Sequence, residues 1–325
     1  MWNKFRQSTF ISSPKTQRSD ELKSRHTSEW TPVHLPYFRS ELPAPLPTEQ
    51  DILKSDTVFR HDDSYHRVVA VGPHFLVKHG RGVREREGQA LLFLESHLNG
   101  AVSIPKLYAM YRIPTNGHLC LVMERIQGES LEAIWHMLGE DAKSTICSKI
   151  RTLFDTIRSV PSPGYYGSVD KGPVPHHLFH SPESDGTICG PFHSEYDFNK
   201  GLVKRLRSIW AANGRHSHKA DFYERNLDSV FSNHKPVFSH SDLQRKNILV
   251  RRVSLETSSG LPTESFEVAL IDWEDAGWYP CYWEYCVIFV AFNWQDDWLM
   301  RAEEILHPWP SEAAMLRMLY QDLWF

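Results

Sequence analysis

Several features that define large protein classes are scarce or missing in this sequence of 325 residues. Its 36 Lys and Arg residues are outnumbered by 40 Asp and Glu residues, so the chain lacks the positive field that non-specific nucleic-acid binding requires. The longest apolar run, from Cys286 to Phe292, is far shorter than the roughly 20 residues that cross a bilayer. The sequence therefore argues against a nucleic-acid-binding protein and against a membrane span.

Cysteine is also scarce, with five residues at positions 120, 147, 189, 281 and 286. The odd number and the absence of a CxxC pair argue against a disulfide framework and against a cysteine zinc site. The start of the chain lacks the apolar core of a secretory signal, so we expect a reducing, cytoplasmic setting. Residues 1–19 are basic and contain no acid, which makes a mitochondrial transit peptide the alternative.

The residues that are present predict a folded protein with two kinds of secondary structure. Residues 1–47, rich in Ser and Thr and finally in Pro, predict a disordered tail or an extended strap, and folding is expected to begin near Thr48. Two β-branched runs then flank Gly72-Pro73, as in a hairpin, and apolar residues recur at helical spacing over residues 82–98. Strands are expected over residues 67–71, 74–78, 106–112 and 119–124.

After Gly128 the apolar spacing becomes helical. Residues 161–191 contain many Pro, Gly and His residues and predict a long loop. Helices are expected around residues 131–138, 146–157, 195–212 and 218–232. This order of elements, strands and one helix followed by helices, predicts an α+β fold.

Three polar residues in the second half of the chain have a spacing that suits phosphoryl transfer. Asp242 follows one apolar strand, Asn247 comes five residues later, and Asp272 ends the next strand. One carboxylate can align a hydroxyl group, while the other carboxylate and the amide can hold Mg²⁺, which prefers oxygen ligands. The alternative is structural: a turn capped by Asp242 and Asn247, and a strand end capped by Asp272.

The motifs His240-x-Asp242-x-x-x-x-Asn247 and Ile271-Asp272 resemble those of the aminoglycoside phosphotransferase family, a branch of the protein-kinase-like fold that includes choline kinases. The chain looks most like fungal members of this family. The resemblance implies that Asp242 is the catalytic base and that Asn247 and Asp272 are magnesium ligands. It also implies that His240 supports the loop without reacting.

The resemblance further implies a bilobal, protein-kinase-like organisation. The expected nucleotide-binding N-lobe, a small antiparallel sheet with one helix, covers residues 48–127. The expected larger and mainly helical C-lobe covers residues 128–325, with a catalytic loop at 238–250 and a metal-binding segment at 268–277.

Lys78 is the expected phosphate-binding lysine, because it ends an apolar strand where the family places that residue. An amine that points inward needs an anion. Glu87 lies on the apolar face of the expected helix, whereas Glu85 points away, so we predict an ion pair between Lys78 and Glu87. The alternative is that Lys78 and a glutamate both face solvent.

The remaining nucleotide contacts are expected from the strand at 120–126, which resembles a kinase hinge. There the Glu124 carbonyl and the Ile126 amide would meet the purine edge, and Met123 would line the pocket; an ordinary strand is the alternative. The chain has no GxGxxG loop, so residues 61–65 would cover the phosphates by position, with Ser64 and backbone amides as donors.

Two clusters permit more than one interpretation. The aromatic residues between 278 and 285 stand beside carboxylates, so they either hold a cationic acceptor or belong to the core. The histidines at 176, 177, 180 and 193 lack a firm zinc-ligand spacing.

The sequence as a whole predicts a Mg²⁺-dependent enzyme that transfers the γ-phosphate of ATP to a hydroxyl group of a small molecule, with a cationic compound as one candidate acceptor. The alternative is a pseudokinase or nucleotide-binding scaffold without turnover, in keeping with the missing glycines. Trp273 replaces the Phe of the protein-kinase Asp-Phe-Gly motif, which argues against phosphorylation of proteins.

Overall fold

The computed structural model describes residues 30–62, 66–256, 262–291 and 296–324 of the chain. The chain divides into two compact units, Thr31–Phe325 and Met1–Trp30, and only Trp30 of the second unit is described. The candidate transit segment at residues 1–19 lies outside the described residues, as does Ser64. All five cysteines are free, in keeping with the absence of a disulfide pattern.

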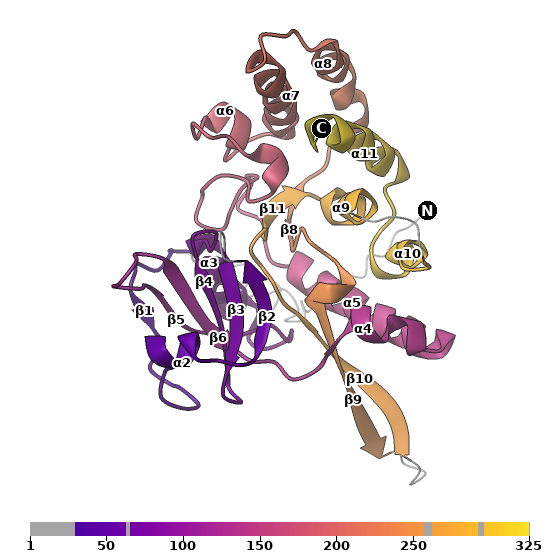
Figure 1. Ribbon diagram of the computed structural model, residues 1–325. Coiled ribbons are helices and arrows are strands. Elements are labelled where there is room, and N and C mark those ends of the chain that lie inside the picture. Colours follow the sequence, from indigo (N-terminus) through magenta and orange to yellow (C-terminus); the bar gives the residue numbers. More distant parts are fainter. Residues whose placement is uncertain (1–29, 63–65, 257–261, 292–295, 325) are drawn as a thin grey trace, which may run out of the picture. The chain divides into compact units, whose positions relative to one another are not determined.

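A six-stranded antiparallel sheet, with strand order β1-β5-β6-β4-β3-β2, carries the first site residues (Figure 1). The predicted hairpin is present as β3 and β4, and its turn uses Gly72 at φ +61°, a left-handed conformation that glycine adopts without strain. The buried faces of the central strands form a hydrophobic cluster that includes Val69, Val77, Cys120 and Val122. The strands are β1 (Tyr37–Phe38), β2 (Val58–Asp62), β3 (His66–Val71), β4 (Phe75–Gly80), β5 (Leu107–Arg112) and β6 (Leu119–Glu124).

Residues before Thr48 take part in this sheet, which differs from the expectation that folding begins there. Tyr37 and Phe38 form the edge strand β1 and pair with Met110 and Ala109 of β5. Two residues are too short for the alternation that identifies a strand in a sequence. The short helix α2 (Glu49–Leu53) follows, capped by Thr48.

The helix α3 (Glu85–Leu98) packs against β5 and brings a buried carboxylate toward the sheet. Its close approach depends on Gly88, because a Cβ atom there would lie 2.6 Å from the Met110 sulfur. The helix ends at Asn99, whose φ of 46° lies in the left-handed region, as the Asn99-Gly100 pair predicts.

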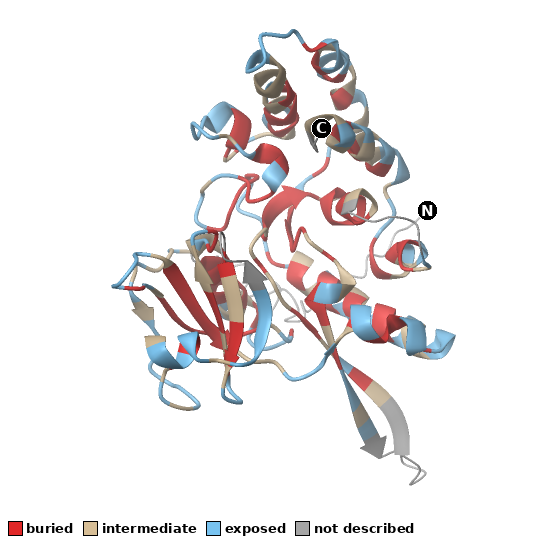
Figure 2. Cartoon of the chain, viewed as in Figure 1, coloured by how far each residue is buried: buried red, intermediate tan, exposed pale blue. Residues whose placement is uncertain are grey.

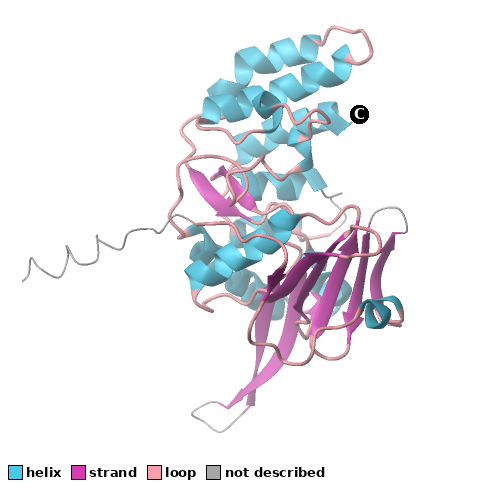
Figure 3. Cartoon of the chain, turned by 90° about the vertical axis from the view of Figure 1, so that its left-hand side faces the viewer, coloured by secondary structure: helices cyan, strands magenta, loops and turns pink. Residues whose placement is uncertain are grey.

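The rest of the chain is mainly helical, as predicted (Figure 3). The long loop at 161–191 is interrupted by two short helical turns, η2 (His177–Phe179) and α6 (Gly186–Cys189). The other helices are α4 (Leu131–Ile134), η1 (Trp135–Met137), α5 (Glu140–Arg158), α7 (Glu195–Ala211), α8 (His218–Val230), α9 (Trp283–Ala291), η4 (Leu299–Arg301), α10 (Ala302–Ile305) and α11 (Pro310–Trp324).

Two small antiparallel sheets within the helical region position the second group of site residues. One pairs β8 (Pro236–Ser239) with β11 (Gly277–Pro280), and the other contains β7 (Glu129–Ser130), β9 (Ile248–Glu256) and β10 (Pro262–Leu270). The short 3-10 helix η3 (Arg245–Asn247) precedes β9. Strands β8 and β11 are buried for most of their length (Figure 2), so the loops that leave them start from fixed points.

The structure agrees with the α+β prediction, since an antiparallel sheet with one long packed helix is followed by a mainly helical region. The division into residues 48–127 and 128–325 stays a prediction. Among the described residues, no helix is long and apolar enough to cross a membrane.

Candidate active site

Lys78 occupies the centre of a buried charged cluster. Its side chain on β4 is 6% exposed, and its Nζ lies 2.8 Å from Glu87 Oε2, 2.8 Å from Asp272 Oδ1 and 2.8 Å from Glu274 Oε2. Nζ donates hydrogen bonds to Asp272 and Glu274, while its contact with Glu87 is an ion pair without hydrogen-bond geometry. The cluster joins β4 and α3 to a segment that follows β10, much later in the chain.

The predicted ion pair between Lys78 and Glu87 is present, and the helical phase chose the correct glutamate. Glu87 is 2% exposed, whereas Glu85 pairs with Arg112 at 2.7 Å on the surface. A charged lysine inside the protein is stabilised only when an anion of this kind accompanies it.

The pKa values in the cluster favour a charged lysine and an ionised Asp272. Burial lowers the pKa of Lys78, but Glu87, Asp272 and Glu274 outweigh it and raise that pKa above its usual range. Burial also opposes ionisation of Asp272, yet Lys78 holds the pKa of this carboxyl below its usual value. For Glu87 burial dominates and raises the pKa to about 7.

Asp242 lies on a loop that hydrogen bonds hold in place. The Asn247 side-chain nitrogen donates to the Asp242 carbonyl at 3.0 Å and to Asp242 Oδ2 at 2.8 Å, and Gln244 Nε2 donates to Asp242 Oδ1. The preceding residue, Ser241, has a φ of 69°, and its amide donates to the fully buried carboxylate of Glu284 at 2.9 Å. The loop therefore presents the Asp242 carboxylate in one orientation.

His240 connects this loop to the segment that carries Asp272. The Asp242 amide donates to His240 Nδ1 at 3.2 Å, which places the ring proton on Nε2, and Nε2 donates to the Ile271 carbonyl at 2.9 Å. The ring is fully buried and packs edge-on against Trp273 at 4.7 Å. These contacts support the expected structural role of His240.

Asp272 follows β10 in a left-handed conformation, with a φ of 65°. The Ile271 amide donates to the Asn247 carbonyl at 2.9 Å, so the two predicted metal ligands sit on directly bonded backbone segments. Because the Asn247 nitrogen is committed to Asp242, its side-chain oxygen is the atom that can act as a ligand. The strained backbone of Asp272 points its carboxylate back toward Lys78.

A cavity of about 220 Å³ brings together most of the predicted nucleotide and metal residues. Its polar lining includes Lys78, Glu87, Asn247 and Asp272, and Met123 lines its apolar part as expected. Further lining residues are Phe59, Arg60, His66, Val68, Leu76, Leu91, Pro105, Lys246, Ile271 and Trp273. Apolar surface beside charged groups suits a flat base attached to phosphates.

Two predicted hinge residues face a different space. Glu124 and Ile126 line a second cavity of about 270 Å³, together with Leu249 and Ala269 of the β9–β10 hairpin. Met123 is thus the one of the three that lines the cavity of Lys78, and the purine contacts of the other two stay predictions. Ser64 and the rest of 63–65 lie outside the described residues.

Three residues of this region were not expected from the sequence to be site residues. Glu274 is a direct partner of Lys78, and its backbone carbonyl also accepts from Arg86 Nε at 2.9 Å. Lys246 lines the cavity beside Asn247. Glu284 holds the loop of Asp242 through a backbone amide. No local pattern in the sequence marks these three residues, because they reach the site through contacts between distant segments.

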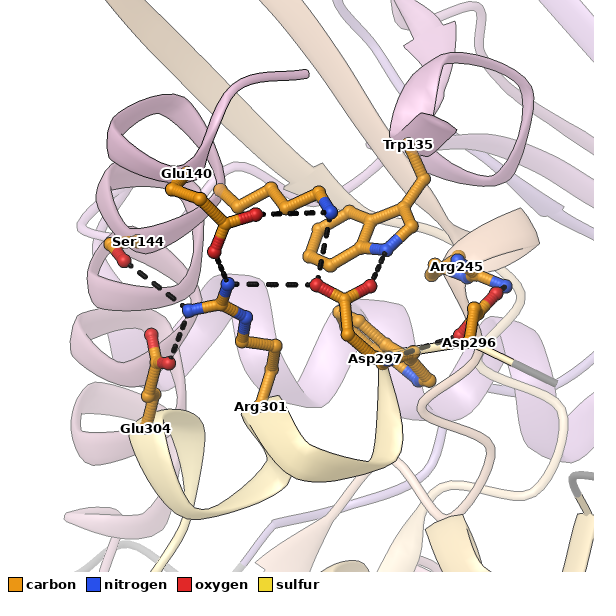
Figure 4. Close-up of polar contacts among 10 residues, drawn as sticks. Trp135, Glu140, Ser144, Arg245, Asp296, Asp297, Arg301 and Glu304 are labelled. Carbon is orange, nitrogen blue, oxygen red and sulfur yellow. Dashed lines mark hydrogen bonds and ion pairs between the residues drawn. The ribbon is translucent and has the colours of Figure 1, made fainter. Parts of the chain in front are cut away.

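The loop of Asp242 is also anchored by Arg245 (Figure 4). The Arg245 guanidinium lies 2.5 Å from Asp296 Oδ2 and over the ring of Trp135 at 5.6 Å. The neighbouring Asp297 accepts from Trp135 Nε1 at 2.7 Å and from Lys143 of α5 at 2.9 Å. This network ties the short helix η3 to α5 and to the segment that begins at Asp296.

The other two clusters from the sequence belong to the structural framework. Trp278, Tyr279, Tyr282, Trp283 and Tyr285 are all buried, which supports the core interpretation and removes them from any surface that could hold a cation. Two groups of possible metal ligands occur among the described residues, Glu87 with Asp272 and Glu274, and the exposed set His216, His218 and Asp221. The histidines of the long loop belong to neither.

Comparison with known proteins adds a family and a fold. Residues 53–315 match the model of the phosphotransferase enzyme family. No curated protein matches the sequence. The resemblance to phosphotransferases that the motifs indicated is thereby confirmed, while the likeness to fungal members stays a prediction.

Three solved structures illustrate the shared fold. ADP-bound aminoglycoside phosphotransferase APH(2'')-Ib is 15% identical, with 84% of this chain and 82% of that chain covered and a TM-score of 0.50. The streptomycin–ATP complex of APH(2'')-IIa is 14% identical (85% and 89% covered, TM-score 0.52). A thermostable mutant of APH(4)-Ia in its apo form is 17% identical, with 85% of this chain and 88% of that chain covered and a TM-score of 0.51. These matches confirm the predicted kinase-like fold.

Proposed function

Because the chain belongs to the phosphotransferase enzyme family, we propose that it transfers the γ-phosphoryl group of ATP to a hydroxyl group of a small molecule, in the presence of Mg²⁺. The observation that carries this proposal is the convergence of Lys78, Glu87, Asn247 and Asp272 on one cavity from segments far apart in the sequence. A set of capped turns and strand ends would not require such a convergence. The nucleotides in the similar structures, ADP, ATP and GDP, support a nucleoside triphosphate as the donor.

The donor set at Asp272 suits a hard divalent cation. Glu87, Asp272 and Glu274 offer carboxylate oxygens within 4.8 Å of one another, and the side-chain oxygen of Asn247 lies on the adjoining segment. Three carboxylates around one ammonium leave an excess of negative charge, which favours Mg²⁺ over a further anion. We propose Asn247 and Asp272 as its ligands, and Mg²⁺ bound there would neutralise charge on the phosphate oxygens.

Asp242 has the position of a base that aligns an acceptor hydroxyl. Donors from Asn247 and Gln244 each satisfy one of its oxygens, and each oxygen keeps a lone pair for another proton. In the proposed reaction the acceptor oxygen bonds to the γ-phosphorus, and the bond from that phosphorus to the β–γ bridging oxygen breaks. The acceptor proton passes to Asp242, and the electron pair of the broken bond leaves with ADP.

Lys78 must change partners before it can bind phosphate, because three carboxylates already surround its Nζ at 2.8 Å. The Glu87 side chain is buried and cannot turn toward solvent. The Glu274 side chain is 36% exposed and can do so. We therefore expect Lys78 to keep Glu87 and to exchange Glu274 for a phosphate oxygen. Glu274 then acts as the group that holds the lysine in place until the nucleotide arrives.

An ATP-consumption assay tests the proposed function directly. The wild-type protein is incubated with ATP and a panel of hydroxyl and amino compounds, cationic ones included, with Mg²⁺ or with excess EDTA. Acceptor-dependent formation of ADP that requires Mg²⁺ supports a kinase. Nucleotide binding without ADP formation for any acceptor would favour the scaffold.

A further inference from the structure

The nucleotide cavity contains a cation that the cluster of Lys78 does not neutralise. Lys246 lines the cavity, its residue is exposed, and among the described residues it has no ion-pair partner. Lys78, in contrast, is surrounded by three carboxylates at 2.8 Å. Much of the charge of Lys78 is thus already balanced by protein, while that of Lys246 is available to a ligand.

The position of Lys246 in the chain places it at the reacting end of the cavity. It directly precedes Asn247, whose amide holds the Asp242 carboxylate at 2.8 Å. The charge of Lys246 also acts on Asp272 and contributes to the lowered pKa of that carboxyl. Lys246 therefore adjoins both the proposed base and a proposed metal ligand.

The other exposed cation of the cavity has a different location. Arg60 belongs to β2, at the edge of the six-stranded sheet, and its charge acts on His66 of the neighbouring strand. Among the described cations that line the cavity, only Lys246 belongs to the loop that carries Asp242. Transfer concentrates negative charge on the γ-phosphoryl oxygens, and a cation stabilises the transition state only where that charge develops.

We propose that Lys246 binds the γ-phosphoryl group of the nucleotide and stabilises its charge during transfer. This inference rests on the proposed function. Lys246 keeps its protons throughout: the acceptor proton goes to Asp242, and the electron pair of the broken bond goes to ADP. The amine acts as a positive charge and a hydrogen-bond donor that follows the phosphoryl group from donor to acceptor.

The test compares two nucleotides that differ in the γ-phosphate. AMP-PNP, an analogue that is not hydrolysed at the β–γ position, and ADP are titrated calorimetrically with Mg²⁺ into the wild type, Lys246→Met and Lys246→Arg. Because hydrogen bonds between charged groups are stronger than neutral ones, we expect Lys246→Met to weaken AMP-PNP about tenfold or more and ADP less than about twofold. Lys246→Arg should recover part of the lost affinity.

Lys149→Met is the matched control, because it removes an exposed lysine of α5 that lies outside the cavity. It should change neither affinity. Equal weakening of AMP-PNP and ADP by Lys246→Met, or no weakening of either, would overturn the assignment to the γ-phosphate. If the wild type bound neither nucleotide, the proposed function itself would fail, so the two failures are distinguishable.

Discussion

Lys78 and Asp242 are held by different forces. Lys78 is buried among three carboxylates, so the nucleotide side of the site is an ionic cluster. Asp242 is held by neutral donors, the amides of Asn247 and Gln244, on a loop supported by His240. The comparison implies that changes at Lys78 affect both stability and nucleotide binding, whereas changes at Asp242 affect turnover far more than stability.

Asp242→Asn should show the difference between the Lys78 cluster and the Asp242 loop most strongly. The change keeps the size of the side chain but removes the base, so turnover should fall about 100- to 10,000-fold. The affinity for Mg²⁺–ATP should stay close to that of the wild type, because no ion pair is lost, and the melting temperature should fall slightly, because the new NH2 group faces one of the amide donors of Asn247 and Gln244. Steady-state kinetics and calorimetry measure the two effects. Turnover at the wild-type rate would refute the assigned role.

Lys78→Met should instead destabilise the protein. It leaves the buried Glu87 without a partner, and breaking a buried ion pair costs about 3–5 kcal/mol. The double variant Lys78→Met, Glu87→Met removes both charges and should recover most of that loss, although neither protein should bind ATP. Urea unfolding measures the free energies. A single variant as stable as the wild type would show that the cluster does not hold the fold together.

Asp275→Asn tests how Asp275 interacts with the acidic groups of the Lys78 cluster and the Asp242 loop. Burial raises the pKa of Asp275 to about 7, opposed by Arg86 and assisted by Glu274, Asp242 and Asp272. Between about pH 4 and pH 7 the folded state keeps a proton that the unfolded state has released, so wild-type stability falls as pH rises. The asparagine variant lacks this effect.

The melting temperature of Asp275→Asn, relative to the wild type, should therefore be higher at pH 8 than at pH 4. A pKa raised from 3.8 to about 7 corresponds to about 4 kcal/mol. Since about 1 kcal/mol corresponds to about 2–4 °C in a protein of about 150–250 residues, the expected difference is about 10 °C. Thermal unfolding at a series of pH values measures it. A difference that does not change with pH would contradict the raised pKa.

Local periodicity was sufficient to predict much of the nucleotide side. The hairpin around Gly72 and the helix of Glu87 follow from β-branched runs and from helical spacing, and the same spacing separated Glu87 from Glu85. The spacing of Asp242 and Asn247 predicted that they lie in one site, and their side chains do form a hydrogen bond.

Contacts between distant segments could not be predicted in this way. Glu274 contacts Lys78, and Lys246 lines the cavity, because the segment after β10 and the helix η3 both come close to Lys78 of β4, and the sequence contains no local pattern for that approach. Glu124 and Ile126 adjoin Met123 in the chain, yet they line another cavity, because the hairpin β9–β10 packs beside the end of β6. A strand of two residues, β1, is likewise invisible to any periodicity.

Thermal shift with ATP, with and without Mg²⁺, tests the central claim most directly when the wild type is compared with Asp272→Ala. A ligand that binds only the folded state raises the melting temperature by mass action. The account predicts a Mg²⁺-dependent rise in the wild type that Asp272→Ala abolishes. No rise at millimolar ATP, or an equal rise in both proteins, would contradict a metal–nucleotide site built on Asp272.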